Sequence, residues 1–243
     1  MIKAIVFDYG GTLDTDGIHW CRKFLEIYKA SGVEIPENVF MNAFAFSEKK
    51  MQGSLQKNDN LLETLRKQVS YQVEYLTGGD KNEIYKRLGE TAEKIIQLSY
   101  EETRSCIYRQ KGLLEKLSDI YMLGIISNFY GNLDTILAEL NIIQYFSAVI
   151  DSEVIGFRKP NEKIFQSVLE NLSVESQNSV LIGDSYEKDI VPAKKLGFTT
   201  VWHKGKRVAS MWDETMADYS ITCLAGLTEV LKIIENKKLA SGS

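Results

Sequence analysis

The sequence has few of the residues from which disulfide-stabilised and histidine-rich metal scaffolds are built. Its three cysteines, Cys21, Cys106 and Cys223, lie far apart and form no Cys-x-x-Cys pair. This odd, scattered set argues against a disulfide framework and against a zinc ribbon, and it favours a cytoplasmic protein. The two histidines, His19 and His203, exclude a three-histidine metal site within one chain. Neither has a partner that the sequence reveals, so we assign neither a catalytic role.

Positive charge and long apolar runs are also scarce. Lys and Arg number 29 against 33 Asp and Glu, which gives a net charge of −4. This balance lacks the basic excess that drives binding to phosphate backbones, so we expect no nucleic-acid partner. No apolar run reaches the roughly 18 residues that a membrane span needs, and the first residues lack the basic-then-apolar pattern of a leader peptide. We therefore expect no membrane association.

Short apolar runs that alternate with helical patterns indicate an α/β core. The runs are rich in β-branched residues and nearly continuous in apolar character, as strands buried on both faces are. We expect strands at residues 2–7, 122–126, 148–150, 180–182, 199–202 and 220–222. We expect helices between and after them at residues 111–119, 133–140, 162–171, 188–196 and 227–234. The alternation predicts a Rossmann-like parallel sheet that helices cover on both faces.

The segment between the first two expected strands has a different pattern. Long apolar residues recur there at helical spacing, and no strand pattern interrupts them. We expect helices near residues 16–31, 36–52, 57–77 and 80–104. The sequence therefore predicts a core of residues 1–15 and 110–236 with an inserted α-helical domain of residues 16–109. Residues 237–243 are polar, and we expect them to form a flexible tail.

Polar side chains follow several of the expected strands. In an open parallel sheet, ligands collect at the carboxyl ends of the strands, so these residues are the candidates for a site. They are Asp8 with the loop Gly10-Gly11-Thr12, the pair Ser127-Asn128, Asp184, and the segment Arg158-Lys159-Pro160 before a helix. Mg²⁺ prefers one or two carboxylates together with substrate oxygens. A lysine and backbone N–H groups neutralise phosphoryl oxygens. The set therefore suits a divalent cation and a phosphate group.

Four segments around these residues form a recognisable series. They are Val6-Phe7-Asp8-Tyr9-Gly10-Gly11-Thr12-Leu13, Ile125-Ile126-Ser127-Asn128, Gly156-Phe157-Arg158-Lys159-Pro160, and Leu181-Ile182-Gly183-Asp184-Ser185 with Asp189. In this order they resemble the haloacid dehalogenase-like (HAD) hydrolase superfamily, over residues 1 to about 235. Each segment alone is moderately specific, whereas the four in order are strongly specific. The helical insertion after the first segment resembles the C1 cap of that family, which closes over the active site.

The resemblance implies a role for each candidate residue. Asp8 would be the nucleophile that forms an aspartyl-phosphate, which splits one displacement into two easier ones. Lys159 would neutralise both Asp8 and the transferring phosphoryl group. The substrate-binding residues that it implies are Thr12, Ser127, Asn128 and Lys159. The implied Mg²⁺ ligands are Asp8, the carbonyl of Gly10, Asp184 and Asp189. For Asp189 it leaves open binding through water or through support of its neighbours.

Gly10 departs from the phosphatase branches of the family, in which a second Asp usually occupies this position and protonates the leaving group. Such general acid–base help contributes about 10²- to 10⁴-fold in rate, and glycine cannot supply it. Three outcomes stay open. The protein can hydrolyse substrates with good leaving groups, such as acyl or aryl phosphates. It can recruit another acid from among Asp14, Asp16, Tyr9 and a cap residue, or it can bind phosphorylated ligands without turnover.

We therefore expect a Mg²⁺-dependent phosphatase that acts on a small phosphorylated metabolite with an atypical general acid. One alternative is a phosphoryl-ligand binding or regulatory protein, which Gly10 favours. The other is a metal-independent dehalogenase, because that branch of the family also lacks the second Asp. Asp184 argues against the dehalogenase, since such a carboxylate chiefly serves a metal that clamps phosphoryl oxygens. We expect a monomer or a homodimer.

The cap would determine which substrate is accepted. Candidate cap residues are Trp20, Arg22, Lys23, Phe44, Phe46, Lys49 and Lys50. Each also has a plain structural interpretation, because aromatic residues at helical spacing usually belong to a core. Closure of a cap over a core excludes water from the site, and we expect hinges near residues 15–17 and 109–112.

Overall fold

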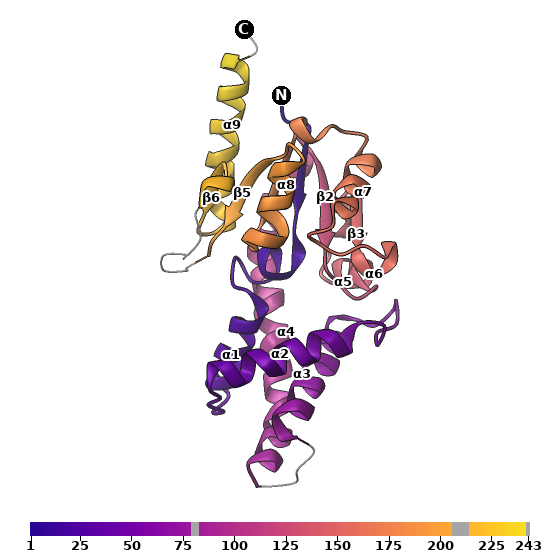
Figure 1. The fold of residues 1–243 in the computed structure, drawn as a ribbon, viewed down its shortest axis with the longest axis vertical. Coiled ribbons are helices and arrows are strands. Elements are labelled where there is room, and N and C mark those ends of the chain that lie inside the picture. The colour runs from indigo at the N-terminus through magenta and orange to yellow at the C-terminus, as the bar shows by residue number, and fades with distance from the viewer. Residues whose placement is uncertain (79–82, 206–213, 242–243) are drawn as a thin grey trace.

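The structure, a computed structural model, describes residues 1–78, 83–205 and 214–241. These residues form a six-stranded parallel sheet with the order β3-β2-β1-β4-β5-β6 (Figure 1). Its strands are β1 (Ala4–Phe7), β2 (Met122–Ser127), β3 (Ala148–Asp151), β4 (Ser179–Gly183), β5 (Thr199–His203) and β6 (Tyr219–Ile221). The predicted parallel α/β core is therefore confirmed, and every expected strand is present.

Two layers of helices cover the sheet. One layer consists of the C-terminal half of α4 (Glu83–Ser118), α5 (Leu133–Glu139) and α9 (Leu227–Ser241), and the other of α7 (Glu162–Leu172) and α8 (Val191–Lys195). The side chains of β1 alternate between the two apolar cores. Ile5 and Phe7 belong to the first core, whereas Ala4 and Val6 belong to the second. Burial on both faces explains the nearly continuous apolar strands of the sequence.

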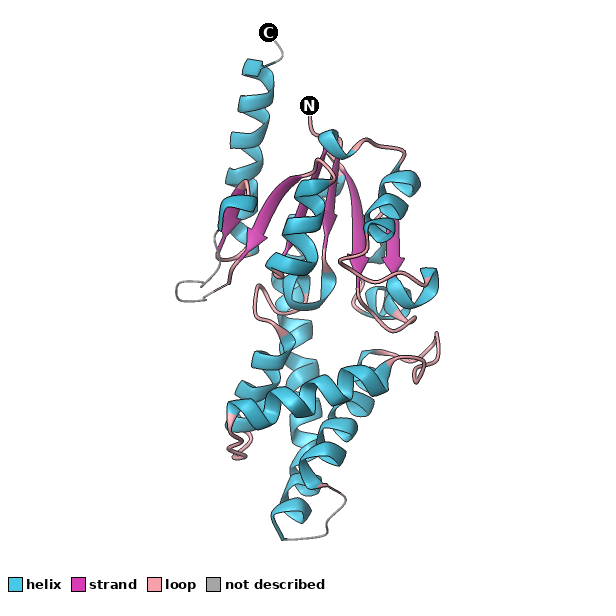
Figure 2. Cartoon of the chain, viewed as in Figure 1, coloured by secondary structure: helices cyan, strands magenta, loops and turns pink. Residues whose placement is uncertain are grey.

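The insertion between β1 and β2 forms a helical cap that faces the carboxyl ends of the strands (Figure 2). Its first helices are α1 (Trp20–Ala30), α2 (Glu37–Met51) and α3 (Leu61–Thr77), which pack with one another and with the N-terminal half of α4. At the start of α3, Asn60 accepts a hydrogen bond from the N–H of Glu63, and the Glu63 carboxylate accepts one from the N–H of Asn60. This reciprocal pair ends the preceding loop and starts the helix.

Helix α4 is continuous, although we expected two helices at residues 80–104 and 111–119. The expected hinge at residues 109–112 and the expected boundary after residue 109 both lie inside it; residues 80–82 are outside the described part. Gly112 is exposed, and a Cβ there would meet no atom within 4 Å. An exposed glycine weakens a helix by only about 1 kcal/mol, so it does not end this one. None of the described helices, α4 included, is apolar enough to cross a membrane.

The end of the chain also differs from the prediction. Helix α9 extends through Ser241, so most of residues 237–243, expected as a flexible tail, is helical; residues 242–243 are outside the described part. The Nζ of Lys237 lies 5.1 Å from the centre of the Tyr219 ring. Polar residues suit the solvent side of a helix as well as they suit a loop, which is why their composition was misleading.

The loop that leads from β1 into the cap is fixed to the core at residues 15–17, where we expected the other hinge. The Oδ1 of Asp16 lies 2.9 Å from Nε2 of the buried His203 and accepts a hydrogen bond from the N–H of Leu224 at 2.9 Å. Gly17 has a φ of +84°, and a Cβ there would lie 2.5 Å from the His203 ring. Both the left-handed backbone and the close contact require glycine. His203 thus has a structural role.

Candidate active site

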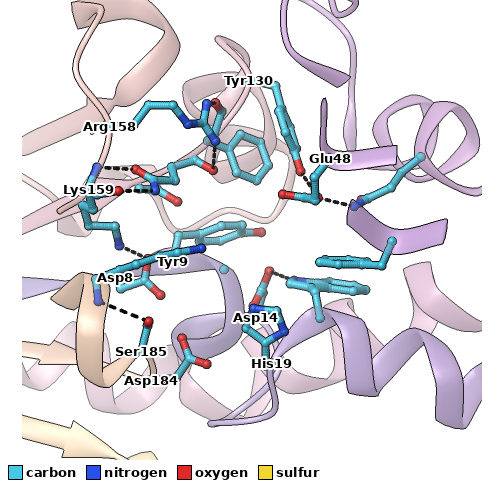
Figure 3. Close-up of a pocket in the computed structure, with 18 of the residues that line it drawn as sticks. Asp8, Tyr9, Asp14, His19, Glu48, Tyr130, Arg158, Lys159, Asp184 and Ser185 are labelled. Atoms are coloured by element: carbon cyan, nitrogen blue, oxygen red, sulfur yellow. Dashed lines mark hydrogen bonds and ion pairs between the residues drawn. The ribbon is translucent and has the colours of Figure 1, made fainter. Parts of the chain in front are cut away.

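Asp8 follows β1 at the carboxyl edge of the sheet and lines a pocket between the core and the cap (Figure 3). Two side chains hold its buried carboxylate. The hydroxyl of Thr12 donates a hydrogen bond to Oδ2 at 2.9 Å, and the Nζ of Lys159 lies 2.5 Å from Oδ1. The N–H of Asp8 donates to the carbonyl of Ile182 at 2.8 Å, which ties the residue to β4. The carboxylate is therefore fixed from both sides.

Lys159 connects Asp8 with Asp189. The Nζ of Lys159 lies 2.7 Å from Oδ1 of Asp189, in addition to its contact with Asp8. Asn128 holds the backbone of this lysine: Oδ1 accepts a hydrogen bond from the N–H at 2.6 Å, and Nδ2 donates one to the carbonyl at 3.0 Å. Burial alone would lower the pKa of Lys159, but the carboxylates of Asp189 and Asp8 raise that pKa above its ordinary value. Lys159 is consequently a cation in the floor of the pocket.

Asp8, Asp184 and Asp189 form a buried acidic cluster. One carboxylate oxygen of each lies within 4.8 Å of the others. Burial raises the pKa of Asp8; Lys159 opposes this rise, whereas the charges of Asp189 and Asp184 add to it. A divalent cation would offset this repulsion, and oxygen atoms are the ligands that Mg²⁺ prefers. The donor set therefore fits Mg²⁺.

Two glycines allow the backbone to approach these carboxylates closely. A Cβ on Gly11, which has a φ of +97°, would lie 2.7 Å from the carboxyl carbon of Asp184. A Cβ on Gly183 would lie 2.5 Å from the Cβ of Asp189. Neither position accepts a side chain while the carboxylates stay in place. The acidic cluster thus depends on glycine in both loops, which is a further fit to a small cation.

The structure separates the residues that we expected to bind the phosphoryl group. Ser127 and Asn128 line the pocket, as do Lys159 and Gly10. Thr12 is fully buried against Asp8 and is not among the lining residues. Asp189 is held on both oxygens, because Oδ2 accepts a hydrogen bond from the N–H of Ser185 at 3.0 Å while Oδ1 pairs with the lysine. These contacts suit a residue that positions its neighbours.

The pocket has a volume of about 600 Å³ and is walled by the cap on the side away from Asp8. Among the cap residues expected to contact substrate, the structure places these in its wall: Trp20, Phe44 and Lys49. The others lie outside it and contact residues of the cap instead: Arg22, Lys23, Phe46 and Lys50. His19, to which we assigned no role, also lines the pocket.

Comparison with known proteins identifies the family. A family model for haloacid dehalogenase-like hydrolases matches residues 2–197. The chain belongs to this family. It is 34% identical over 144 residues to a glyceraldehyde 3-phosphate phosphatase of Pyrococcus furiosus, a match that covers 56% of this chain and 60% of that relative. The chain therefore spans less than two thirds of the length of this HAD relative.

Solved HAD structures share the fold. A HAD phosphatase from Thermococcus onnurineus matches with a TM-score of 0.53 at 23% identity, over 95% of this chain and 98% of that one. A 2-haloacid dehalogenase from Pseudomonas syringae pv. Tomato matches with a TM-score of 0.55 at 20% identity, over 96% and 99% of the two chains. Phosphatases and dehalogenases of the HAD family thus have the same architecture, so the fold alone does not choose between them.

Sequence reasoning missed a polar cluster at the boundary between the HAD core and the cap. Glu48 of α2 accepts hydrogen bonds on Oε1 from the Tyr130 hydroxyl at 2.5 Å and from Nε2 of Gln68 at 2.7 Å. All of them line the pocket. In the sequence, Glu48 stands beside Lys49 and Lys50 and is typical of a solvated helix face. The position of Tyr130, just after the second of the four segments, Ile125-Ile126-Ser127-Asn128, was the one available signal.

The acidic residues after β1 have different surroundings in this HAD hydrolase. Asp14 lines the pocket and is buried; it accepts hydrogen bonds from the N–H of Gly11 at 2.7 Å and from Nε1 of Trp20 at 2.6 Å. Burial raises the pKa of Asp14 to about 7, although both hydrogen bonds oppose the rise. Asp16 is tied to His203 and does not line the pocket.

Proposed function

We propose that this HAD hydrolase is a Mg²⁺-dependent phosphatase that acts on a small phosphorylated metabolite through an aspartyl-phosphate on Asp8. The observation that carries the proposal is the meeting of Asp8, Lys159 and Asp184 at one end of a pocket of metabolite size. The name of the Pyrococcus furiosus relative supports this reaction. The retained Asp184 favours it over metal-independent dehalogenation.

The chemistry follows from the contacts of Asp8. One carboxylate oxygen attacks the phosphorus, the bond from phosphorus to the leaving oxygen breaks, and that oxygen takes up a proton. Water then attacks the phosphorus of the aspartyl-phosphate, which releases phosphate and restores the carboxylate. Lys159 stabilises the charge on the phosphoryl oxygens. Mg²⁺, held by Asp8, Asp184 and the carbonyl of Gly10, with Asp189 nearby, would supply further charge stabilisation.

We infer that Asp14 takes the acid–base role that Gly10 cannot fill. Asp14 lies on the same loop and lines the same pocket. Its pKa of about 7 is close to the operating pH, where a general acid works best. Burial raises the pKa of Tyr9 well above its ordinary value, and Asp16 is occupied by His203, so both are poorer candidates.

Asparagine at position 14 tests this role. We expect Asp14→Asn to reduce turnover of an alkyl phosphate by about 10²-fold, the low end of what acid–base help contributes. Acetyl phosphate, whose leaving group needs little protonation, should lose much less. With the wild-type protein, alkyl phosphate turnover should fall as pH rises through about 7, because Asp14 then loses its proton. Initial rates from pH 5.5 to 9 on both substrates measure this; an equal loss on both would contradict the role and indicate a structural function.

The reaction itself is tested by phosphate release from acetyl phosphate, p-nitrophenyl phosphate and an alkyl phosphate, with Mg²⁺ and with EDTA. We expect release with Mg²⁺, loss in EDTA and recovery when Mg²⁺ is restored. The metal supplies both orientation and charge neutralisation, so its removal should reduce the rate by several orders of magnitude.

Two results would contradict the phosphatase. Chloride release from a 2-haloacid without added metal would indicate the dehalogenase. Calorimetric binding of phosphorylated ligands without turnover on any of the three substrates would indicate a binding or regulatory protein.

Cys21, Cys106 and Cys223 are free thiols, which supports the proposed cytoplasmic location. The monomeric or homodimeric state stays a prediction from the sequence.

A further inference from the structure

The cap wall of the pocket contains a carboxylate that the phosphatase chemistry does not use. Glu48 of α2 lies opposite Asp8 and Lys159, across the pocket (Figure 3). It is the cap partner in a contact with the core, since Tyr130 follows β2 and its hydroxyl donates a hydrogen bond to Oε1 of Glu48. A substrate whose phosphate lies at Asp8 and Lys159 would therefore direct its other end toward Glu48.

The hydrogen bonds of Glu48 are unevenly divided between its two oxygens. In the described part of the chain, the donors found for it are Tyr130 and Gln68, and both reach Oε1. These two contacts fix the carboxylate, and Oε2 remains available in the pocket lining. Burial raises the pKa of Glu48, whereas the hydrogen bond from Tyr130 opposes the rise. A carboxylate oxygen in a partly enclosed pocket is stabilised by a donor, and a bound ligand can provide it.

The charges near Glu48 indicate what kind of donor fits. Arg158 and Lys188 line the same pocket, and their positive charges lower the pKa of Glu48. Because these cations already offset the carboxylate, a ligand ammonium group would gain little and would be repelled by them. An anionic group would be attracted by Arg158 and Lys188, but the carboxylate of Glu48 would repel it at the hydrogen-bonding position itself. A neutral hydroxyl group donates to Oε2 without either conflict.

Aromatic side chains complete the wall. Trp20 and Phe44 line the pocket from the cap. The buried ring of Phe24, which is not among the lining residues, supports both: its centroid lies 4.9 Å from that of Trp20 and 6.4 Å from that of Phe44. Such surfaces suit the C–H face of a short carbon chain, while a nearby carboxylate takes its hydroxyl groups. The wall thus combines an apolar surface with one fixed acceptor.

We propose that Glu48 is a specificity-determining residue whose Oε2 accepts a hydrogen bond from a hydroxyl group of the leaving group. The substrate is then a hydroxylated phosphate ester of the polyol or sugar phosphate class, without a second anionic group. This rests on the proposed phosphatase function, of which it names the substrate class. The hydrogen bond from Tyr130 holds the acceptor in place and joins cap and core around the same ligand.

Binding of phosphonates, which cannot be hydrolysed, tests the proposal without any turnover. Calorimetry with Mg²⁺ compares 3,4-dihydroxybutylphosphonate, n-butylphosphonate and 4-aminobutylphosphonate on the wild-type protein, Glu48→Met and Glu74→Met. We expect the wild-type protein to bind the dihydroxy ligand at least tenfold more tightly than the butyl ligand. Glu48→Met should bring that ratio close to one. Glu74→Met is the matched control, because Glu74 is an exposed cap residue that pairs with Lys50 outside the pocket lining, and it should keep the ratio.

The ratio also separates specificity from folding. A loss of structure in Glu48→Met lowers the affinity for both ligands, whereas loss of a hydroxyl acceptor lowers only the first. The proposal is overturned if the wild-type protein shows no preference, if Glu48→Met keeps the preference, if neither ligand binds, or if the amino ligand binds most tightly. Acetyl phosphate turnover of the wild-type protein, measured alongside, reports separately on the phosphatase proposal.

Discussion

Replacing Asp8 with asparagine is expected to abolish metal-dependent phosphate release from every substrate of the panel. An amide oxygen is a poor nucleophile and carries no charge to hold the cation, so the variant loses two functions together. Removal of a nucleophile that acts as part of a unit typically reduces kcat by roughly 10⁴-fold or more. Asn has the shape of Asp, but its single amide oxygen can accept from Thr12 or from Lys159 and not from both.

Acid-quenched labelling measures the intermediate directly. Wild-type protein mixed with acetyl phosphate should carry a base-labile phosphoryl group, and Asp8→Asn should carry none. Asp134→Asn is the control, since Asp134 is an exposed residue in the first turn of α5. Full labelling or substantial turnover in Asp8→Asn would show that another residue is the nucleophile.

Aspartate at position 10 should have the opposite effect. Gly10 has φ −76° and ψ 113°, which any L-residue can adopt, and the nearest atom to a Cβ there is Cδ1 of Trp20 at 3.8 Å. A Cβ at this position therefore fits without strain, and Gly10 itself lines the pocket. In the Asp14→Asn background, where the proposed general acid is missing, we expect Gly10→Asp to increase alkyl phosphate turnover by about 10²-fold through restored acid–base help.

Gly10→Asn is the matched variant for this gain, because it adds the same volume without an acid. Steady-state rates on acetyl phosphate and an alkyl phosphate measure both. Acetyl phosphate turnover should change little in either variant. If the asparagine variant gains as much as the aspartate variant, the benefit comes from packing against Trp20 and the acid–base explanation is wrong. In an Asp14→Asn background, Gly10→Asp should restore what that substitution removes.

The core of the fold could be predicted from local sequence because its strands are buried on both faces. Runs such as residues 122–126 and 180–182 are short, apolar and followed at once by polar residues, so both the strands and the sheet edge that carries Asp8 and Asp184 follow from pattern alone. The role of Lys159 was harder to predict from the sequence. Lys159 is a common surface residue type, and only its place in the order of segments singled it out; its contact with Asp8 joins residues 151 positions apart.

Trp20, Phe44 and Lys49 of the cap were expected in the pocket wall, whereas Glu48 could not be predicted, for a physical reason. Glu48 owes its surroundings to Gln68 and Tyr130, which lie 20 and 82 residues away along the chain. Helical periodicity says which residues share a face, but it does not say which other helix or loop covers that face. The same limit applies to Asp14 and Asp16. They are alike in sequence, and only the positions of Trp20 and His203 distinguish them.

The continuous helix α4 constrains how the cap can move relative to the core. At 1.5 Å per residue, its 36 residues extend over ~54 Å, and one rigid rod is therefore shared by both halves of the molecule. Because α4 runs unbroken from the cap into the core, the cap can move relative to the sheet only if α4 bends or if the C-terminal turns of α4 shift against the sheet. The second connection between core and cap is the loop after β1, which the contact between Asp16 and His203 holds to the core. A movement of the cap that widened the pocket would therefore strain α4 and the contact between Asp16 and His203 together.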